Sequence, residues 1–391
     1  MAVRALEFYS GIGGLHLALA RSSIDAEIIQ ALDWDQTACN VYRANHGNVV
    51  RKVDISTLSA SELSALKADL WLLSPACQPY TVLNPNAKGA DDPRAQSFTH
   101  LVKNVLPALA ASDEHPLRLL VENVAGFEDS ATRQILVSTL RSIGYTTLEL
   151  LLTPLQFGIP NSRLRYYLLA KKSPIPFRHI PSDALDEVWR QIPGSGVAWS
   201  DPRLDIKINA NFDLPGIRKI QSYLDDDTTE TTDEYRVPDK VLEKWGRLFD
   251  ITKPSSTRTC CFTRGYTQLV ERSGSILQQN ESLDTTSTFD EFLEAQSAGL
   301  PDAVKLLYPL KLRYFSPAEL LRMFAFDPVN PERVKSQFIW PDSISRKTKY
   351  KLIGNSVNVK VVQELIEYLF DEPESCGIKQ SRMSPVAHNG H

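Results

Sequence analysis

A single cysteine stands between two prolines in the stretch SPACQPY, residues 74–80, directly after the apolar run at 68–73. Ligands of open α/β sheets bind at the carboxyl ends of the strands, so Cys77 would lie where a thiolate nucleophile is useful. Pro75 and Pro79 would stiffen the loop and hold the sulfur in one place. A free cysteine is nevertheless more often a small buried hydrophobic residue than a catalytic thiolate. Cys77 alone therefore leaves both interpretations open.

A glycine-rich turn, FYSGIGGL at residues 8–15, joins the first candidate strand to the first candidate helix, and its small residues would let backbone amides approach a ligand. Asp33 follows 20 residues after Gly13, at the end of the second candidate strand, where a carboxylate can accept hydrogen bonds from both hydroxyls of a ribose. Asp54, after the third candidate strand, could meet an adenine amino group. The turn departs from GxGxxG, which favours a single nucleoside over a dinucleotide. The alternative is that the glycines only shape a tight turn and the aspartates are helix caps.

Two further charged motifs stand at the ends of later candidate strands. Glu122, in ENV, would lie beside the Cys77 loop at the same sheet edge, where a half-buried carboxyl group could stay protonated near neutral pH. Arg163 and Arg165, in NSRLRY, alternate as they lead into a strand and therefore face the same side. The simpler interpretation is a surface carboxylate and a salt-bridged strand entrance.

These residues must be positioned by a sheet. Short apolar runs alternate with helix-period segments over residues 1–172, the pattern of βαβ units. The expected strands are 4–9, 27–32, 70–73, 118–122, 147–152 and 166–170. The expected helices between them include 15–21, 98–111 and 134–142. The pattern predicts a doubly wound, Rossmann-like parallel α/β sheet with helices on both faces.

The composition of the sequence changes near residue 173. Prolines, a Gly-Ser-Gly stretch and an acidic, Thr-rich run follow there and indicate a smaller inserted domain. The alternation of strand-like and helix-like segments resumes near residue 312, and a capping box with Ser316 at the N-cap predicts a helix there. An amphipathic helix is expected at 359–370. We therefore expect one domain from residues 1–172 and 312–371, an inserted region at 173–311, and a disordered tail at 372–391.

Composition excludes several classes of protein. With 391 residues, 42% of them hydrophobic and 23% charged, the chain is typical of a globular protein, and no apolar run is long enough for a membrane span. Its five cysteines fit neither a disulfide framework nor a zinc site, so we expect free thiols and no metal. The N-terminus lacks a targeting segment, which favours the cytoplasm or, alternatively, the nucleus. A net charge of −4 limits nucleic-acid contacts to local basic clusters.

Five motifs in order, FYSGIGGL, SPACQPY, ENV, NSRLRY and GNSV, resemble the cytosine-C5 methyltransferases that use S-adenosylmethionine. The resemblance covers residues 1–172 and about 312–370, with the variable target-recognition region of that family between them. The segment CCFTRGY at 260–266 is similar to the eukaryotic type-two DNA methyltransferase homologues. That branch methylates cytosine 38 in the anticodon loop of aspartate tRNA.

The resemblance implies roles for individual residues. Cys77 would attack C6 of cytosine while Glu122 donates a proton or hydrogen bond to the ring, and Arg163 and Arg165 would hold the base, a phosphate or the Cys77 loop. Ala76 departs from the family, which usually has proline before the cysteine. The residues implied for the methyl donor are Tyr9, Gly11, Gly13, Gly14, Leu15, Asp33, Asp54, Ile55, Pro75, Asn355, Ser356 and Val357.

Two other functions remain open from the sequence. A DNA cytosine-5 methyltransferase would share every catalytic residue named here and differ only in the inserted region. A catalytically silent relative could keep the donor pocket for nucleic-acid binding alone. The expected partner is the anticodon loop of a tRNA, with DNA as the alternative and no membrane. The oligomeric state is left open, with a monomer favoured.

Overall fold

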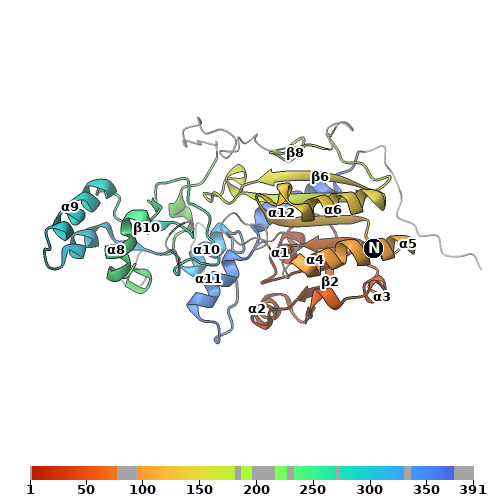
Figure 1. Cartoon of the computed structure of the whole chain (residues 1–391), viewed down its shortest axis with the longest axis horizontal. Coiled ribbons are helices and arrows are strands. Elements are labelled where there is room, and N and C mark those ends of the chain that lie inside the picture. The colour runs from red at the N-terminus through yellow and green to blue at the C-terminus, as the bar shows by residue number, and fades with distance from the viewer. Residues whose placement is uncertain are drawn as a thin grey trace, which may run out of the picture.

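The computed structural model of the chain describes residues 2–76, 95–180, 186–195, 216–226, 233–269, 271, 273–329 and 336–373. Cys77 and residues 374–391 of the predicted tail lie outside these ranges. A large sheet flanked by helices forms one end of the molecule, and α8, α9 and β10 of the inserted region extend away from it (Figure 1).

The large sheet has eight strands in the order β3-β2-β1-β4-β5-β7-β6-β8. The order reverses between β1 and β4, and such a point is where α/β sheets open a crevice for ligands. The glycine-rich turn leaves β1 and the Cys77 loop leaves β4, so both start at this crevice. The strands are β1 (Val3–Phe8), β2 (Ala26–Asp33), β3 (Val50–Lys52), β4 (Leu70–Leu73), β5 (Arg118–Val124), β6 (Tyr145–Leu152), β7 (Arg165–Lys172) and β8 (Val188–Trp189).

One strand corrects the expectation of a wholly parallel sheet. β7 lies between β5 and β6 and runs antiparallel to both. The link from β6 to β7 contains only the short 3-10 helix η6 (Pro154–Phe157), and a parallel crossover usually needs an α-helix. β7 therefore returns beside β6 in the opposite direction. The antiparallel register places Arg165 opposite Val124 and Tyr167 opposite Glu122, so the start of β7 meets the end of β5.

Helices cover both faces of the sheet, as the sequence predicts. On β4, Leu70 and Leu72 belong to one buried cluster, whereas Trp71 and Leu73 belong to another. Because successive side chains of a strand point to opposite faces, the two clusters are the two helix layers. The helices α1 (Gly14–Ala20), α2 (Gln36–His46) and α12 (Val359–Phe370) supply the first cluster, and α3 (Ala60–Ser64), α4 (Gln96–His100), α5 (Leu106–Ala111) and α6 (Ala131–Ser142) supply the second.

The helix expected at 98–111 is one helical segment with a change of pitch. A π-helical turn, η4 (Leu101–Val105), separates α4 from α5. Pro107 stands in the first turn of α5 and cannot donate an intrahelical hydrogen bond, which accounts for the irregular turn before it. No helix within the described ranges is both long and apolar enough to cross a membrane.

The inserted region has its own small core. Nine buried side chains between Val237 and Leu312 form a third cluster, separate from the two that flank the large sheet. A three-stranded sheet, in the order β11-β10-β9, supports this core. Its strands and α-helices are β9 (Ile251–Thr252), β10 (Ile276–Gln278), β11 (Leu312–Arg313), α8 (Asp239–Trp245) and α9 (Thr285–Ser297). The remaining short helices are η1 (Ile55–Thr57), η5 (Phe127–Asp129), η8 (Ile220–Tyr223), η9 (Gly246–Leu248) and η10 (Ala303–Leu310).

The chain returns from the inserted region through two helices, α10 (Pro317–Met323) and α11 (Arg346–Gly354). The capping box predicted at the start of α10 is present, because Ser316 and Glu319 bond reciprocally to each other's backbone amides. Past α12, Glu372 forms an ion pair with Arg118 of β5. The predicted tail thus begins with at least one residue that contacts the sheet.

Candidate active site

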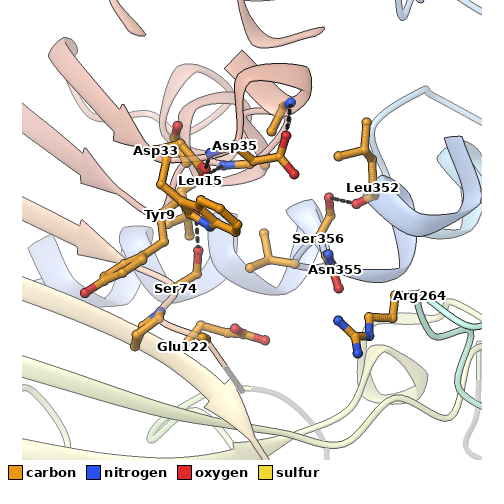
Figure 2. A pocket seen from close by; sticks show the side chains of 18 of the residues that line it. Tyr9, Leu15, Asp33, Asp35, Ser74, Glu122, Arg264, Leu352, Asn355 and Ser356 are labelled. Carbon is orange, nitrogen blue, oxygen red and sulfur yellow. Dashed lines mark hydrogen bonds between the residues drawn. The ribbon is translucent and has the colours of Figure 1, made fainter. Parts of the chain in front are cut away.

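A cavity of about 480 Å³ opens at the crevice between β1 and β4, a size typical of small-ligand pockets. Asp33 and Asp35 lie on one side of it, Glu122 on another, and Asn355 and Ser356 opposite the glycine-rich turn (Figure 2). Apart from Gly13 and the undescribed Cys77, all the predicted site residues line this cavity: Tyr9, Gly11, Gly14, Leu15, Asp33, Asp54, Ile55, Pro75, Glu122, Arg163, Arg165, Asn355, Ser356 and Val357.

Gly13 shapes the turn instead of facing the cavity. It is the N-cap of α1 with φ 86°, in the left-handed region that glycine adopts without steric cost. A Cβ atom added there would lie 2.3 Å from the His46 ring. Both observations require glycine at this position, independently of any ligand.

Asp33 fastens the glycine-rich turn to the end of β2. Its Oδ2 accepts a 2.8 Å hydrogen bond from the Gly11 amide, and its Oδ1 accepts a 2.8 Å bond from the Asp35 amide. Burial raises the pKa of Asp33, although these two bonds act in the opposite direction. A carboxylate has about four acceptor sites, so these two bonds leave capacity for a ligand hydroxyl.

Asp54 combines the two roles that the sequence left open. Its Oδ1 accepts hydrogen bonds from the amide and the hydroxyl of Ser56, at 2.9 and 2.7 Å, and so caps η1. These bonds lower the pKa of Asp54, which keeps it ionised. Asp54 and the buried Ile55 both line the cavity. Asp54 therefore caps η1 and forms part of the cavity wall at the same time.

Sequence reasoning missed several residues that line the cavity. Trp34 directly follows Asp33, and its side chain is 74% exposed, an unusual environment for tryptophan. Lys351 of α11 reaches to 3.6 Å from Asp35, which lies on the far side of the cavity. A tryptophan placed immediately after a strand that ends in aspartate was a detectable signal for a planar ligand. The contact of Lys351 depends on tertiary structure and left no such signal.

Arg264 enters the cavity from the inserted region. Figure 2 shows Arg264 and Glu122 extending toward each other from different elements. The CCFTRGY segment, noted in the sequence only for its resemblance, therefore supplies a cation to the pocket.

Glu122 is a buried carboxyl group at the end of β5, with 8% of the residue exposed. Burial raises the pKa of Glu122, while the charges of Arg165 and Arg163 partly offset that rise. The Arg165 Nε atom lies 3.5 Å from Glu122 Oε1. Glu122 therefore holds its proton to a higher pH than an exposed glutamate would.

Arg163 holds three segments of the chain together. Its Nη1 donates a 2.9 Å hydrogen bond to the Phe262 carbonyl, and its Nη2 donates to the carbonyls of Ser356 and Gly354, at 2.7 and 3.2 Å. The guanidinium also packs 4.9 Å from the ring centroid of Phe324. Backbone carbonyls thus occupy much of the donor capacity that the sequence assigned to substrate.

Gly354 is where two of those segments touch. A Cβ atom added to it would lie 2.2 Å from the Thr263 carbonyl carbon and 2.3 Å from the Arg264 amide nitrogen. Backbone cannot yield at such distances, so only glycine permits this approach. The glycine of GNSV thereby brings the CCFTRGY segment against the cavity.

Comparison with known proteins agrees with this architecture. The chain matches the family of C-5 cytosine-specific DNA methylases over residues 3–371. It is 39% identical over 370 residues to the tRNA (cytosine(38)-C(5))-methyltransferase of Schizosaccharomyces pombe, covering 94% of this chain and 97% of that protein. A Dictyostelium discoideum relative named DNA (cytosine-5)-methyltransferase is 34% identical over 388 residues, covering 95% of each chain.

A solved structure shows the same similarity in three dimensions. The crystal structure of the S. pombe Dnmt2 methyltransferase is similar with a TM-score of 0.72 and 36% sequence identity, covering 94% of this chain and 98% of that one. The matches extend through the large sheet, the inserted region and the returning helices. The chain belongs to the family of C-5 cytosine-specific DNA methylases.

Proposed function

We propose that this protein transfers a methyl group from S-adenosylmethionine to C5 of cytosine 38 in the anticodon loop of a tRNA. The observation that carries the proposal is the 39% identity, over nearly all of both chains, to a relative named for that reaction. Most of the inserted region, which would select the nucleic acid, is included in that similarity. The Dictyostelium discoideum relative named for DNA keeps DNA methylation as the second candidate.

The cavity suits an adenosine that carries cationic groups. Trp34 offers an exposed aromatic surface for a purine ring, and the carboxylates of Asp33 and Asp54 offer acceptors for hydroxyl and amino groups. Acidic side chains also favour the positive charges of an amino acid ammonium and a sulfonium. When bound, S-adenosylmethionine supplies a methyl group on its sulfonium.

Glu122 and Cys77 would activate the cytosine together. The Cys77 thiolate would form a bond to C6, and the electron pair of the C5–C6 double bond would shift to the C4–C5 bond. The electron pair of the C4–N3 double bond would then take the proton of Glu122 at N3. C5 becomes a nucleophile by this addition. After methylation, a base removes the C5 proton, the C5–C6 double bond is restored as the sulfur leaves C6, and N3 returns its proton to Glu122.

Arg165 would support this chemistry from its position between strand and cavity. Its Nε lies 3.5 Å from Glu122, and a cation near a cysteine favours the thiolate. The cytosine must leave its stack to enter such a site, and an unpaired loop nucleotide does so at lower cost than a base in a duplex. These considerations favour an RNA loop as substrate.

The test is methyl transfer by the purified full-length protein from labelled S-adenosylmethionine to total tRNA, to an aspartate tRNA transcript and to duplex DNA. We expect label in tRNA, at one cytosine of the anticodon loop when mapped by bisulfite sequencing. Cys77→Ala should abolish transfer while donor binding persists. Label found in duplex DNA and absent from tRNA would establish the second candidate instead.

A further inference from the structure

The thiol of Cys261 lies between the two active-site arginines. Arg163 Nη1 is 3.5 Å and Arg165 Nη2 is 3.7 Å from Cys261 Sγ, both within reach of hydrogen bonds to sulfur. The second of these guanidinium groups also carries the Nε that lies 3.5 Å from Glu122. Cys261 and Glu122 are therefore joined through Arg165.

A guanidinium group can only donate hydrogen bonds, so both arginines require an acceptor at the sulfur. A thiolate is a far better acceptor than a thiol. Burial alone would raise the pKa of the Cys261 thiol, but the charges and hydrogen bonds of Arg165 and Arg163 bring it below its ordinary value. The contacts and the charges therefore both favour the ionised sulfur.

We propose that Cys261 is a positioning residue whose thiolate neutralises part of the charge of Arg163 and Arg165 and so keeps Glu122 protonated for catalysis. This inference rests on the proposed methyl transfer. The physical reason is that the charges of two nearby cations stabilise the ionised form of a buried carboxyl group. An anion between the cations weakens that effect and leaves the proton on Glu122.

Other titratable groups around these side chains are few among the described residues. Tyr167 faces Glu122 from β7 and is uncharged, since burial raises its pKa far above neutrality. Arg264 enters the same cavity as Glu122 from the inserted region. Asp250 acts on Cys260 rather than on Cys261. Among the described residues, Cys261 is the ionisable group whose sulfur contacts both arginines directly.

The neighbouring Cys260 provides a natural contrast. Burial raises the pKa of Cys260 to about 12, and Ser275 and Asp250, in place of arginines, are its polar neighbours. It is therefore an uncharged thiol at neutral pH. The pKa values of these two adjacent cysteines are therefore shifted in opposite directions.

A simpler interpretation is that Cys261 remains a thiol and donates its hydrogen to the Phe262 carbonyl, which lies 3.7 Å from the sulfur. The same carbonyl already accepts the shorter 2.9 Å bond from Arg163. Serine could replace a donating thiol, whereas aspartate could not. The two interpretations therefore predict opposite orders for the Ser and Asp variants.

The decisive experiment measures the protonation of Glu122 without substrate. Infrared difference spectra, with Glu122→Gln as reference, follow the protonated carboxyl band against pH in the wild type, C261S, C261N and C261D. We expect C261S and C261N to lower the pKa of Glu122 by on the order of one pH unit, the effect of one charge in a partly buried site. C261D should restore it. An unchanged Glu122 titration in C261S, or equal titrations in C261N and C261D, would overturn the proposal.

Kinetics give the second readout. As the pH rises, kcat/KM for tRNA methylation should begin to fall at a lower pH in C261S and C261N than in the wild type. The reason is that Glu122 loses its proton at a lower pH in these variants. C260S is the matched control and should keep the wild-type profile. Thermal unfolding of C261N and C261D checks that both fold. If the wild type labels no tRNA, the proposed function fails, while the infrared titration still decides the role of Cys261.

Discussion

The Arg163 guanidinium donates a 2.7 Å hydrogen bond to the carbonyl oxygen of Ser356, joining the segment before β7 to the segment after α11. These residues are 193 positions apart in the chain. The bond is charge-assisted and buried, since only 3% of Arg163 is exposed. One side of the cavity therefore depends on a side chain that the sequence associates with the substrate.

Replacing Arg163 with lysine should weaken both the fold and the donor site. Lysine cannot reproduce the planar fork that serves three carbonyls, so we expect a loss of roughly 2 kcal/mol or more in unfolding free energy. Chemical denaturation measures this loss, and calorimetry with S-adenosylhomocysteine measures donor-site affinity. The control is Arg346→Lys, an exposed arginine that also donates to a backbone carbonyl. Equal stability of the two variants would contradict the conclusion that Arg163 holds the three segments together.

Gly354→Ala should separate two segments that now touch. The added methyl group would lie 2.2 Å from the Thr263 carbonyl carbon, so backbone must shift and overpacking should cost roughly 1 to 3 kcal/mol. We expect methylation to fall more than donor binding, because Arg264 leaves its place at the cavity. Gly265→Ala is the control, since the atoms nearest to its added methyl group belong to the 63% exposed side chain of Leu269 and not to backbone. Comparable loss of activity in both variants would argue against this explanation.

Trp34→Ala should reduce affinity for the methyl donor without destabilising the protein. The side chain is 74% exposed and lines the cavity, so little core packing is lost. Loss of an aromatic contact of about 1 kcal/mol corresponds to roughly a fivefold weaker binding. Calorimetric titration tests this, with Trp34→Phe expected to retain most of the affinity. Trp245→Ala, at the end of α8 and outside the cavity, should bind the donor like the wild type.

Glu7 should make stability fall as the pH rises. It is fully buried in β1, accepts a 2.7 Å bond from the Tyr42 hydroxyl, and burial raises its pKa to about 8. The folded state thus keeps a proton that the unfolded chain releases above its ordinary pKa of 4.5. The resulting stabilisation is complete below that value and is lost as the pH rises through about 8.

Glu7→Gln removes this titration. Its amide oxygen can still accept the hydrogen bond that the His16 amide donates to Glu7, and its NH2 group can donate to the Tyr42 hydroxyl oxygen. Relative to the variant, the wild type should lose roughly 2 to 4 kcal/mol of unfolding free energy between about pH 5 and about pH 8. Urea denaturation at several pH values measures the difference. Parallel pH dependences in the two proteins would show that Glu7 is ionised in the folded state.

The α/β class and the helices on both faces follow from local patterns, which is why the sequence predicted them. The prediction of a parallel sheet was wrong for β7, which is antiparallel, because the direction of a strand depends on how its connection packs. The cavity lining at Asp33 and Asp54 was foreseeable, since strand ends collect at one edge. Their hydrogen bonds to Gly11 and Ser56 were not, because such bonds depend on loop geometry.

The contacts of Arg163 could not be predicted from local sequence patterns either. Its partners, Phe262 and Ser356, come from the inserted region and from the returning segment. No periodicity or spacing in the sequence relates these positions. The contacts of Cys261 were hidden for the same reason, although its motif was noticed. Pairings between distant segments are set by tertiary packing, which local sequence patterns do not encode.

The long separation between Arg163 and its acceptors has a consequence for synthesis on the ribosome. Domains fold as the chain emerges from its N-terminus, and the first four strands can pair while the acceptors of this cation are still unmade. Until the segment that contains Ser356 leaves the exit tunnel, the guanidinium must stay hydrated, and its surroundings cannot close over it. A nascent chain arrested before that point should therefore expose an unfinished, protease-sensitive edge beside β7.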